Sequence, residues 1–456
     1  MKKILLLIKF EALSFRADKG LLLLTALMLA AGLYSIYYGT QEIARQRENL
    51  AELEQLETHT IEELKKKYPG EADAGTVAYY FPVFAQNQPQ PWAGLALGQR
   101  DVNPYYLKLR LLNLQAQLYD TENINPLKVL SGNFDLAFVL VYLFPLFIIT
   151  LGYNVLSQEK ERGTLPLLLS QPIRLSTVVI SKLGFQVILV LGMAWLLSIL
   201  GFIGAGISPD GRIALWLLVV TLYCLFWFGA TFLVIALRKN SSFNAVILLG
   251  IWLVLTMVLP SLMNIYVTVS QPLPQGIDLT VQQREAMHSG WDKPKEETMQ
   301  QFYALYPQWA DDTPIKGRFS WHWYYAMHEM GDQAVKDLVQ AYKSGLQKRQ
   351  ALTYDLSGFS LPVNAQAALN ALAGTDLDSH LQFMESIEQY HVSLKEFYYP
   401  FLFRQLPFTH ADYEKLPTHR FTTKPATDLV LGGITKLLFS TVLVMTGGYL
   451  FFQRKN

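Results

Sequence analysis

Six apolar runs dominate this sequence, and each is long enough to cross a lipid bilayer. A helix needs about 20 mostly apolar residues to span the hydrocarbon core. The runs that qualify are 20–38, 133–156, 175–207, 213–237, 243–269 and 429–452. Hydrophobic residues make up 51% of the 456 residues and charged residues only 16%, a balance typical of integral membrane proteins. The sequence therefore predicts an all-α membrane protein with six transmembrane helices.

Basic residues are distributed unevenly around the ends of these runs and predict their orientation. Lysine and arginine collect on the cytoplasmic side of membrane proteins. Here they cluster before the first run, between the second and third, after the fourth and after the sixth. All four clusters lie on one side of the membrane if both termini are cytoplasmic, and we predict that orientation.

The first 19 residues differ from a membrane span. Their apolar stretch is short, and the charged residues Lys9, Glu11 and Arg16 follow it. Segment 1–19 therefore predicts an amphipathic helix that lies on the cytoplasmic face of the membrane and leads into the first span.

Two long segments, 39–132 and 270–427, then lie on the periplasmic side as mainly α-helical insertions. In the first, apolar residues recur at roughly helical spacing, namely Ile43, Leu50, Leu53, Ile61 and Leu64. This helix is either a stalk that pairs with a second copy of the chain or a part of its own domain. The sequence leaves both alternatives open.

The larger segment, 270–427, is long enough to form a domain by itself. Runs without proline predict helices over 295–306, 321–355, 363–373 and 376–399. We interpret the aromatic run 319–330 as core, with contact to the bilayer surface or to an amphiphilic substrate as the alternative. Seven of the eight histidines lie in this segment, but their spacing differs from that of metal ligands on one helix face. We therefore predict ordinary core or surface histidines and no metal site.

The connection between the second and third spans, 157–174, reads SQEKERGTLPLLLSQPIR. Four of its five charged residues, 159–162, fall within about one helical turn. Gly163 and Thr164 offer a flexible joint and a cap for a second short helix, and a run of leucines follows. From the residues alone, this is either a solvated loop with an interfacial leucine patch or a place where another protein binds.

The stretch 151–186 resembles ABC-2-type permeases, whose loop commonly reads E-x-E-x-G-T-x-x-x-L-L-x-x-P followed by a basic residue. In that family the short helix binds a separate ATP-binding subunit, so the resemblance implies the same role here. The candidate coupling residues are Glu159, Lys160, Glu161, Arg162, Gly163, Thr164, Leu168, Leu169, Pro172 and Arg174. Pro166 departs mildly from the pattern, in the first turn of the expected helix, where proline is tolerated.

A second stretch, 360–391, resembles the outer domain of a permease subfamily with a large helical periplasmic domain before the last span. The recurring phrase is LSPxxxxxxxLxxLAGTDxxRHxxF, and the matching positions are Leu372, Ala373, Gly374, Thr375, Asp376, His380 and Phe383. Ser379 stands where the subfamily usually has arginine, which puts in doubt any role of a positive charge there. Gly374 and a helix cap at Thr375 or Asp376 also explain this turn structurally.

Together the resemblances imply a permease subunit of an ATP-driven ABC transporter in the bacterial inner membrane, exporting or extracting a substrate. The implied partners are an ABC ATP-binding subunit, a second permease copy or a sister permease, and membrane lipid, with a periplasmic partner left open. No cofactor is expected to bind directly, because ATP would be used by the partner and no G-x-x-x-x-G-K-[ST] stretch is present. The net charge of +1 gives no indication of nucleic-acid binding.

Two alternatives from other classes remain at this point. A membrane-anchored periplasmic enzyme would need a catalytic or metal-binding cluster within 270–427, where the sequence offers only scattered histidines. An envelope assembly protein would need no ATPase at all.

Overall fold

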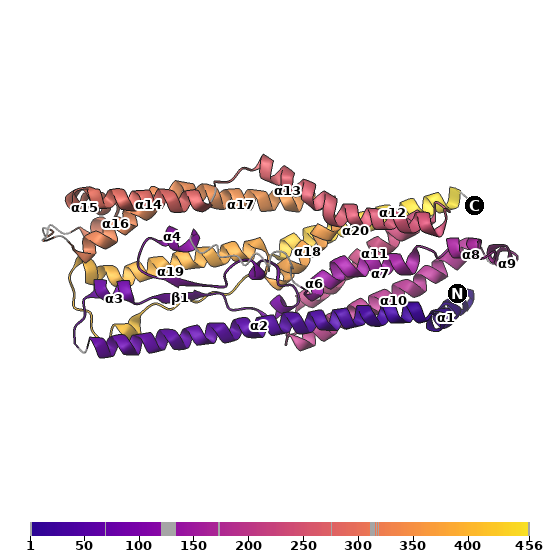
Figure 1. The fold of residues 1–456 in the computed structure, drawn as a ribbon, viewed down its shortest axis with the longest axis horizontal. Helices are drawn as coiled ribbons and strands as arrows, with labels where there is room; N and C mark the ends of the chain where they lie inside the picture. Colours follow the sequence, from indigo (N-terminus) through magenta and orange to yellow (C-terminus); the bar gives the residue numbers. More distant parts are fainter. Residues whose placement is uncertain are drawn as a thin grey trace.

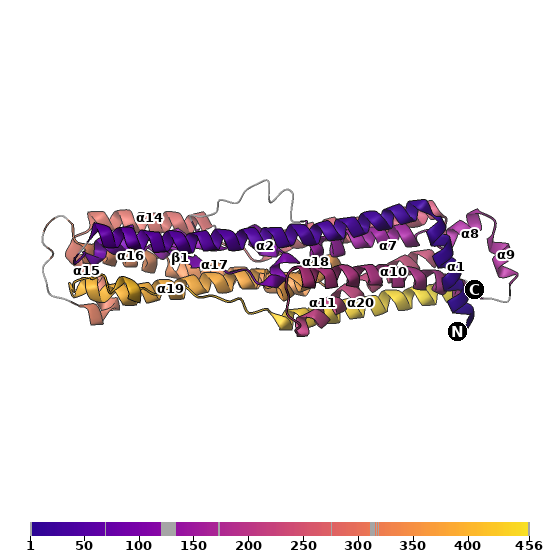
Figure 2. The same ribbon diagram turned by 90° about the horizontal axis from the view of Figure 1, so that it is seen from below.

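The computed structural model is an elongated helical molecule with two cores that follow one another along its long axis (Figure 1). It describes residues 2–68, 70–119, 134–171, 174–274, 276–310, 315, 317 and 319–454. One end carries both termini and the 157–174 connection, and the other end carries helices α14–α16 (Figures 1 and 2).

Six helices of the described chain are long and apolar enough to cross a membrane. Their bounds are Lys19–Lys67, Leu136–Glu161, Leu175–Gly204, Gly211–Ile235, Ser241–Ser270 and Thr427–Arg454. In the labels of Figure 1 they are α2, the α6–α8 stretch, α10, α11, the α12–α13 stretch and α20. The predicted fold class, an all-α membrane protein, is confirmed.

The first span continues without a break into the segment outside it. Helix α1 covers Lys2–Ala17, and α2 then begins at Lys19, where the Asp18 carboxylate accepts hydrogen bonds from the amides of Gly20 and Leu21. At about 1.5 Å per residue, the 49 residues of α2 extend over about 73 Å, more than half the length of the molecule in Figure 1. Its residues Ile43, Leu50 and Leu64 are buried within this chain, so the outer half of α2 packs on its own domain.

The fifth span contains a wide turn. It consists of α12 (Ser241–Leu253), the π-helical segment η4 (Val254–Val258) and α13 (Leu259–Ser270). Pro260 has no N–H for the carbonyl of Thr256, and a π-helical turn just before a proline relieves the loss of that bond.

The core of the membrane part is built from α7 (Phe144–Gly152), α10, α11 and α20, with the fully buried Phe144, Trp216 and Trp227. It also includes α18 (Leu361–Ala373), which was predicted within the large periplasmic segment. Small residues let α18 approach α20 closely, and Asn364 donates a hydrogen bond to the carbonyl oxygen of Gly433 (2.9 Å). Segment 270–427 therefore contributes one helix to the core that the candidate spans form, in addition to the helices of the outer core.

The outer core is mainly helical and contains one small sheet. Its helices are α3 (Ala74–Tyr80), α4 (Leu114–Tyr119), α14 (Gly276–Asp292), α15 (Lys295–Leu305), α16 (Trp321–Ala334), α17 (Lys336–Leu356) and α19 (Leu377–Phe403). Strands β1 (Val83–Gln86) and β2 (Tyr106–Leu109) pair antiparallel, with Val83 opposite Leu109. The predicted run 321–355 is two helices, because α16 ends at Ala334 and α17 begins after Val335. Trp323 and Tyr325 are fully buried here, which supports the interpretation of the aromatic run as core.

Candidate functional site

The 157–174 connection forms two short helices joined by a glycine. Helix α8 covers Ser157–Glu161 and α9 covers Leu165–Leu169. Gly163 has a φ of +72°, in the left-handed region that favours glycine. The amide of Thr164 donates to the carbonyl oxygen of Glu159 (3.0 Å), which closes the turn between the helices.

Glu159 points inward and holds the loop to two other helices. Its carboxylate lies 2.7 Å from the ammonium group of Lys182 in α10 and also accepts a hydrogen bond from the Thr164 hydroxyl. Lys182 lies 3.6 Å from the carboxylate of Glu11 in α1 as well. Charge-assisted contacts of this kind are stronger than neutral hydrogen bonds, so the loop, α1 and α10 are tied together.

Glu161 makes a second connection, to the fifth span. Its two carboxylate oxygens accept from the amide and the hydroxyl of Ser241, at 2.7 and 2.8 Å. Ser241 is the first residue of α12, and the Ser157 hydroxyl lies 2.8 Å from the Ser241 hydroxyl. A carboxylate at a helix N-terminus also complements the partial positive charge of that end.

The other candidate residues differ in their positions. Lys160, Arg162 and Arg174 are exposed, and Leu167 is 69% exposed. Leu168 and Leu169 belong to α9, whereas Pro172 lies outside the described residues. The sequence alone did not reveal the partners Glu11, Lys182 and Ser241, because they come from segments that only the fold brings to the loop.

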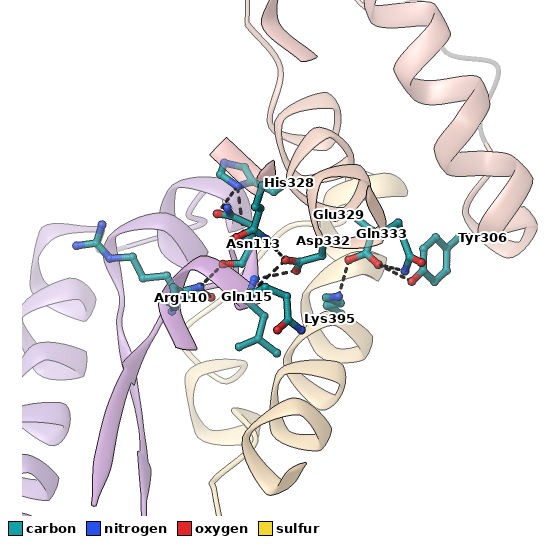
Figure 3. Close-up of polar contacts among 12 residues, drawn as sticks. Arg110, Asn113, Gln115, Tyr306, His328, Glu329, Asp332, Gln333 and Lys395 are labelled. Carbon is teal, nitrogen blue, oxygen red and sulfur yellow. Dashed lines mark hydrogen bonds and ion pairs between the residues drawn. The ribbon is translucent and has the colours of Figure 1, made fainter. Parts of the chain in front are cut away.

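The large outer segment contains a buried polar network (Figure 3). Glu329, which is 3% exposed, pairs with Lys395 and accepts hydrogen bonds from the Tyr306 hydroxyl (2.6 Å) and the Gln333 amide (3.0 Å). These contacts outweigh burial and hold the pKa of Glu329 below its usual value. The network joins α16 to α19 and to the residue after α15.

One turn along α16, Asp332 binds the start of α4. Its carboxylate accepts from the amides of Leu114 (2.8 Å) and Gln115 (3.2 Å) and from the Gln283 side chain. His328 lies beside it, and its Nδ1 accepts from the amide of Asn113 (3.2 Å). Most of these groups bond to one another or to the backbone, which is the arrangement of a structural network, although His328 Nε2 and Gln283 Oε1 are buried without a hydrogen-bond partner among the residues that the structure describes. Within the described residues, no group of three or more His, Cys, Asp or Glu is placed to hold a metal ion.

Burial of the histidines predicts that the outer domain loses stability in acid. His328 and His391 are 6% and 1% exposed, and burial lowers the pKa of each to about 3. Below pH 6.5 the unfolded chain binds protons at these residues while the folded chain does not, so stability falls with pH down to about 3. At pH 5 this costs about 2 kcal/mol per histidine relative to pH 8. Burial raises the pKa of Asp332 to about 7, which favours the folded state at low pH and recovers about 2–3 kcal/mol.

Thermal unfolding of the wild type and two variants between pH 8 and pH 5 tests this balance. Other buried groups titrate alike in all three proteins, so the test is the difference between their pH profiles. His328→Asn keeps an acceptor for the Asn113 amide but cannot titrate, so between pH 8 and pH 5 it should lose about 2 kcal/mol less stability than the wild type. Asp332→Asn lacks the opposing contribution and should show the steepest fall. Identical pH profiles for the wild type and His328→Asn would show that His328 does not bind its proton on unfolding.

The AGTD turn joins the two cores. Gly374 ends α18 with a φ of +66°, and Asp376 caps α19 by accepting from the amide of Ser379 (3.1 Å). The Thr375 hydroxyl donates to the carbonyl oxygen of Ala96 (2.8 Å). The expected structural explanation of this turn agrees with these contacts, and Ser379, in place of arginine, donates its hydroxyl to Asp376.

Comparison with known families gives two matches. Residues 127–283 match the model described as ABC-2 family transporter protein, and residues 278–422 match a domain of unknown function, DUF3526. No curated protein matches the chain. The first match includes the 157–174 connection and four of the six candidate spans, and it confirms the resemblance to ABC-2-type permeases that the sequence predicted.

Proposed function

We propose that this chain, an ABC-2-type permease by its residues 127–283, couples to a separate ATP-binding subunit through the 157–174 connection. The observation that carries the proposal is that different residues of the loop contact the permease and the solvent. Its acidic residues bind the chain's own helices, while Lys160, Arg162 and Leu167 are exposed at the end of the molecule that also carries both termini (Figure 1). An exposed leucine between basic side chains offers another protein both apolar area and charge.

The contacts of the acidic residues suggest how motion of the loop reaches the spans. A partner that displaces α8 would pull on α10 and α1 through Glu159 and Lys182, and on α12 through Glu161 and Ser241. The third and fifth spans would then move with the loop. Differential binding of the ATP-loaded and ATP-free partner would shift the permease between conformations.

The remaining features of the proposal rest on the distribution of basic residues and on the resemblance to ABC-2-type permeases. Both termini and the loop lie in the cytoplasm of a bacterial cell, the six helices cross the inner membrane, and the outer domain is periplasmic. The partner binds and hydrolyses ATP, and this chain binds no cofactor itself. Two permease subunits, identical or related, form the path along which the substrate is exported or extracted.

Two kinds of substitution separate binding of the ATPase from transmission of its motion. Leu167→Asp should reduce co-purification of the ATP-binding subunit at least about tenfold, because it places a charge in the apolar contact. Glu161→Ala should leave co-purification intact but lower the ATPase activity of the assembled complex, since the bond to α12 is lost. The assay is the yield and specific ATPase activity of the complex purified through a tag on this chain.

Leu56→Asp is the matched control, because Leu56 is 51% exposed on the outer half of α2. It should not change either quantity. Normal co-purification of the Leu167→Asp protein would show that the loop is not the binding site.

A further inference from the structure

The outer domain contains a cavity of about 430 Å³ beside the first span. Its walls come from α2, from the chain between η2 (Gly98–Asp101) and β2, and from α4, α17 and α19. This volume lies within the range of about 300–1,000 Å³ that is usual for small-molecule sites. Nothing in the polar network of Figure 3 contributes to its walls, so the cavity is a separate feature.

The cavity begins close to the membrane surface if the six helices span the bilayer as proposed. The apolar run of α2 ends near Tyr38, and the first cavity residues on α2 are Glu42 and Arg45. At about 1.5 Å per residue, they lie about 6 and 10 Å beyond the end of that run. The head-group region of a bilayer is about 5–8 Å thick on each side. The α2 side of the cavity therefore begins at the level of lipid head groups.

One wall carries a buried positive charge. Arg100 is 8% exposed, and its guanidinium donates to the side-chain oxygen of Gln46 (3.0 and 3.1 Å) and to the carbonyl oxygen of Asn87 (2.8 Å). Burial lowers the pKa of Arg100 to about 10, so the group stays charged at neutral pH. Both partners are neutral, and within the described residues Arg100 forms no ion pair.

Neither of the acidic residues that line the cavity, Glu42 and Asp101, forms an ion pair with Arg100 in the described part of the chain. Glu42 pairs instead with Arg45. His380 also lines the cavity, and burial lowers its pKa to about 4, so it is neutral at physiological pH. A buried cation whose hydrogen bonds are all to neutral groups attracts an anion more strongly than a surface arginine does.

The other lining residues are largely apolar and come mainly from α19 and α17. The apolar side chains are those of Leu107, Leu346, Leu377, Phe383, Met384 and Ile387. Apolar walls with one convergent cation can bury a hydrocarbon chain while binding a charged head group.

We propose that this cavity binds an amphiphile with an apolar chain and an anionic head group, a carboxylate or a phosphate, which enters from the outer leaflet. Arg100 binds the head group, and the α17 and α19 side chains contact the hydrocarbon chain. The route of entry rests on the proposed orientation of the spans, whereas binding itself depends only on the cavity. The AGTD turn adjoins the site, because α19 begins at Leu377, a cavity residue, directly after Asp376.

The test measures binding of palmitate and dodecyl phosphate to the full chain, purified in a neutral detergent, by native mass spectrometry. We expect palmitate and dodecyl phosphate to bind with similar occupancy. Dodecyltrimethylammonium and dodecanol should bind at least about tenfold more weakly. Arg100→Gln should reduce binding of both anions at least about tenfold. Leu346→Trp should block binding by filling the cavity while Arg100 remains. Arg404→Gln, at an exposed arginine of the outer domain, should bind like the wild type.

Competition with phosphatidylglycerol in nanodiscs identifies the source of the ligand. If this phospholipid displaces palmitate, the natural ligand is a membrane lipid. If palmitate stays bound, the natural ligand is a free single-chain amphiphile. Either outcome supports the site. Two outcomes would overturn the proposed site. One is equal binding of the anionic, neutral and cationic chains. The other is unchanged anion binding in both the Arg100→Gln and Leu346→Trp proteins when both melt at the normal temperature. Because no ATPase is present in this assay, its failure would be separate from a failure of the coupling proposal.

Discussion

Replacing Gly39 with alanine is expected to destabilise the protein by about 3 kcal/mol, the upper end of the usual cost of overpacking. A Cβ at this position would lie 1.9 Å from the carbonyl oxygen of Gly94 and 2.9 Å from its carbonyl carbon. The atoms in the way belong to the backbone of η1 (Pro91–Gly94), so no side chain can rotate to make room. The melting temperature of the purified protein should fall by about 3 °C, measured by size-exclusion chromatography after heating.

The expected loss of stability is large because other contacts depend on the close approach of α2 and η1 at Gly39. Gly39 lies just past the apolar run of α2, and η1 leads directly into Ala96, whose carbonyl oxygen binds Thr375 of the AGTD turn. A displaced η1 would therefore loosen the junction between α18 and α19 as well. The contact of α2 with η1 is one of the places where the membrane core and the outer core are joined.

Gly192→Ala in α10 is the matched control. No atom lies within 4 Å of the position that a Cβ would occupy there, and the residue is exposed. Alanine is also a better helix former than glycine, so this variant should melt at or slightly above the wild-type temperature. If Gly39→Ala melted like Gly192→Ala, the backbones of α2 and η1 would have to be farther apart than in the structure.

Most of the membrane part could be predicted from the sequence, because apolar length is a strong signal. Each of the six apolar runs corresponds to one helix of suitable length. What the sequence could not give was the place of α18. Its pattern of small and apolar residues fits burial in either core, and only its packing on α20 and the bond of Asn364 to Gly433 place it in the membrane part.

The candidate loop was predictable as a segment but not in its contacts. Spacing alone placed the acidic residues within one helical turn of the other charges and indicated no partners for them. In the structure Glu159 and Glu161 bind Lys182 and Ser241. These partners are 23 and 80 residues away along the chain. Side chains brought together by tertiary packing leave no local pattern in a single sequence, and the same holds for Arg100 and Gln46 in the cavity.

The partners in the polar network of the outer domain also come from distant parts of the sequence, so no local pattern predicts them. Substituting Lys395 in this network is the second change for which we expect a large loss of stability. Removing the positive partner of a buried ion pair leaves an uncompensated charge, which costs about 3–5 kcal/mol. Lys395→Met should therefore destabilise the protein by that amount, since Glu329 keeps only Tyr306 and Gln333 as partners in the described network.

The pH dependence of this loss distinguishes a buried charge from a simple loss of packing. Without Lys395, burial should raise the pKa of Glu329 above its unfolded value, so protonation would favour the folded state. The deficit of Lys395→Met should then be smaller at pH 5 than at pH 8, when each is compared with the wild type at the same pH. The double variant Lys395→Met/Glu329→Gln should recover most of the loss at pH 8, because no charge remains to be buried.

Lys343→Met provides the comparison for a less buried pair. Lys343 and Glu388 join α17 to α19 as Lys395 and Glu329 join α19 to α16, but their side chains are 21% and 26% exposed. Water reaches the remaining carboxylate more readily there, so the loss should be clearly smaller than that of Lys395→Met at pH 8. Equal losses in the two lysine variants, or no recovery in the double variant, would mean that Glu329 is reached by water and that the network does not depend on its ion pair. The large difference expected between them follows from burial alone, because the two pairs have the same chemistry.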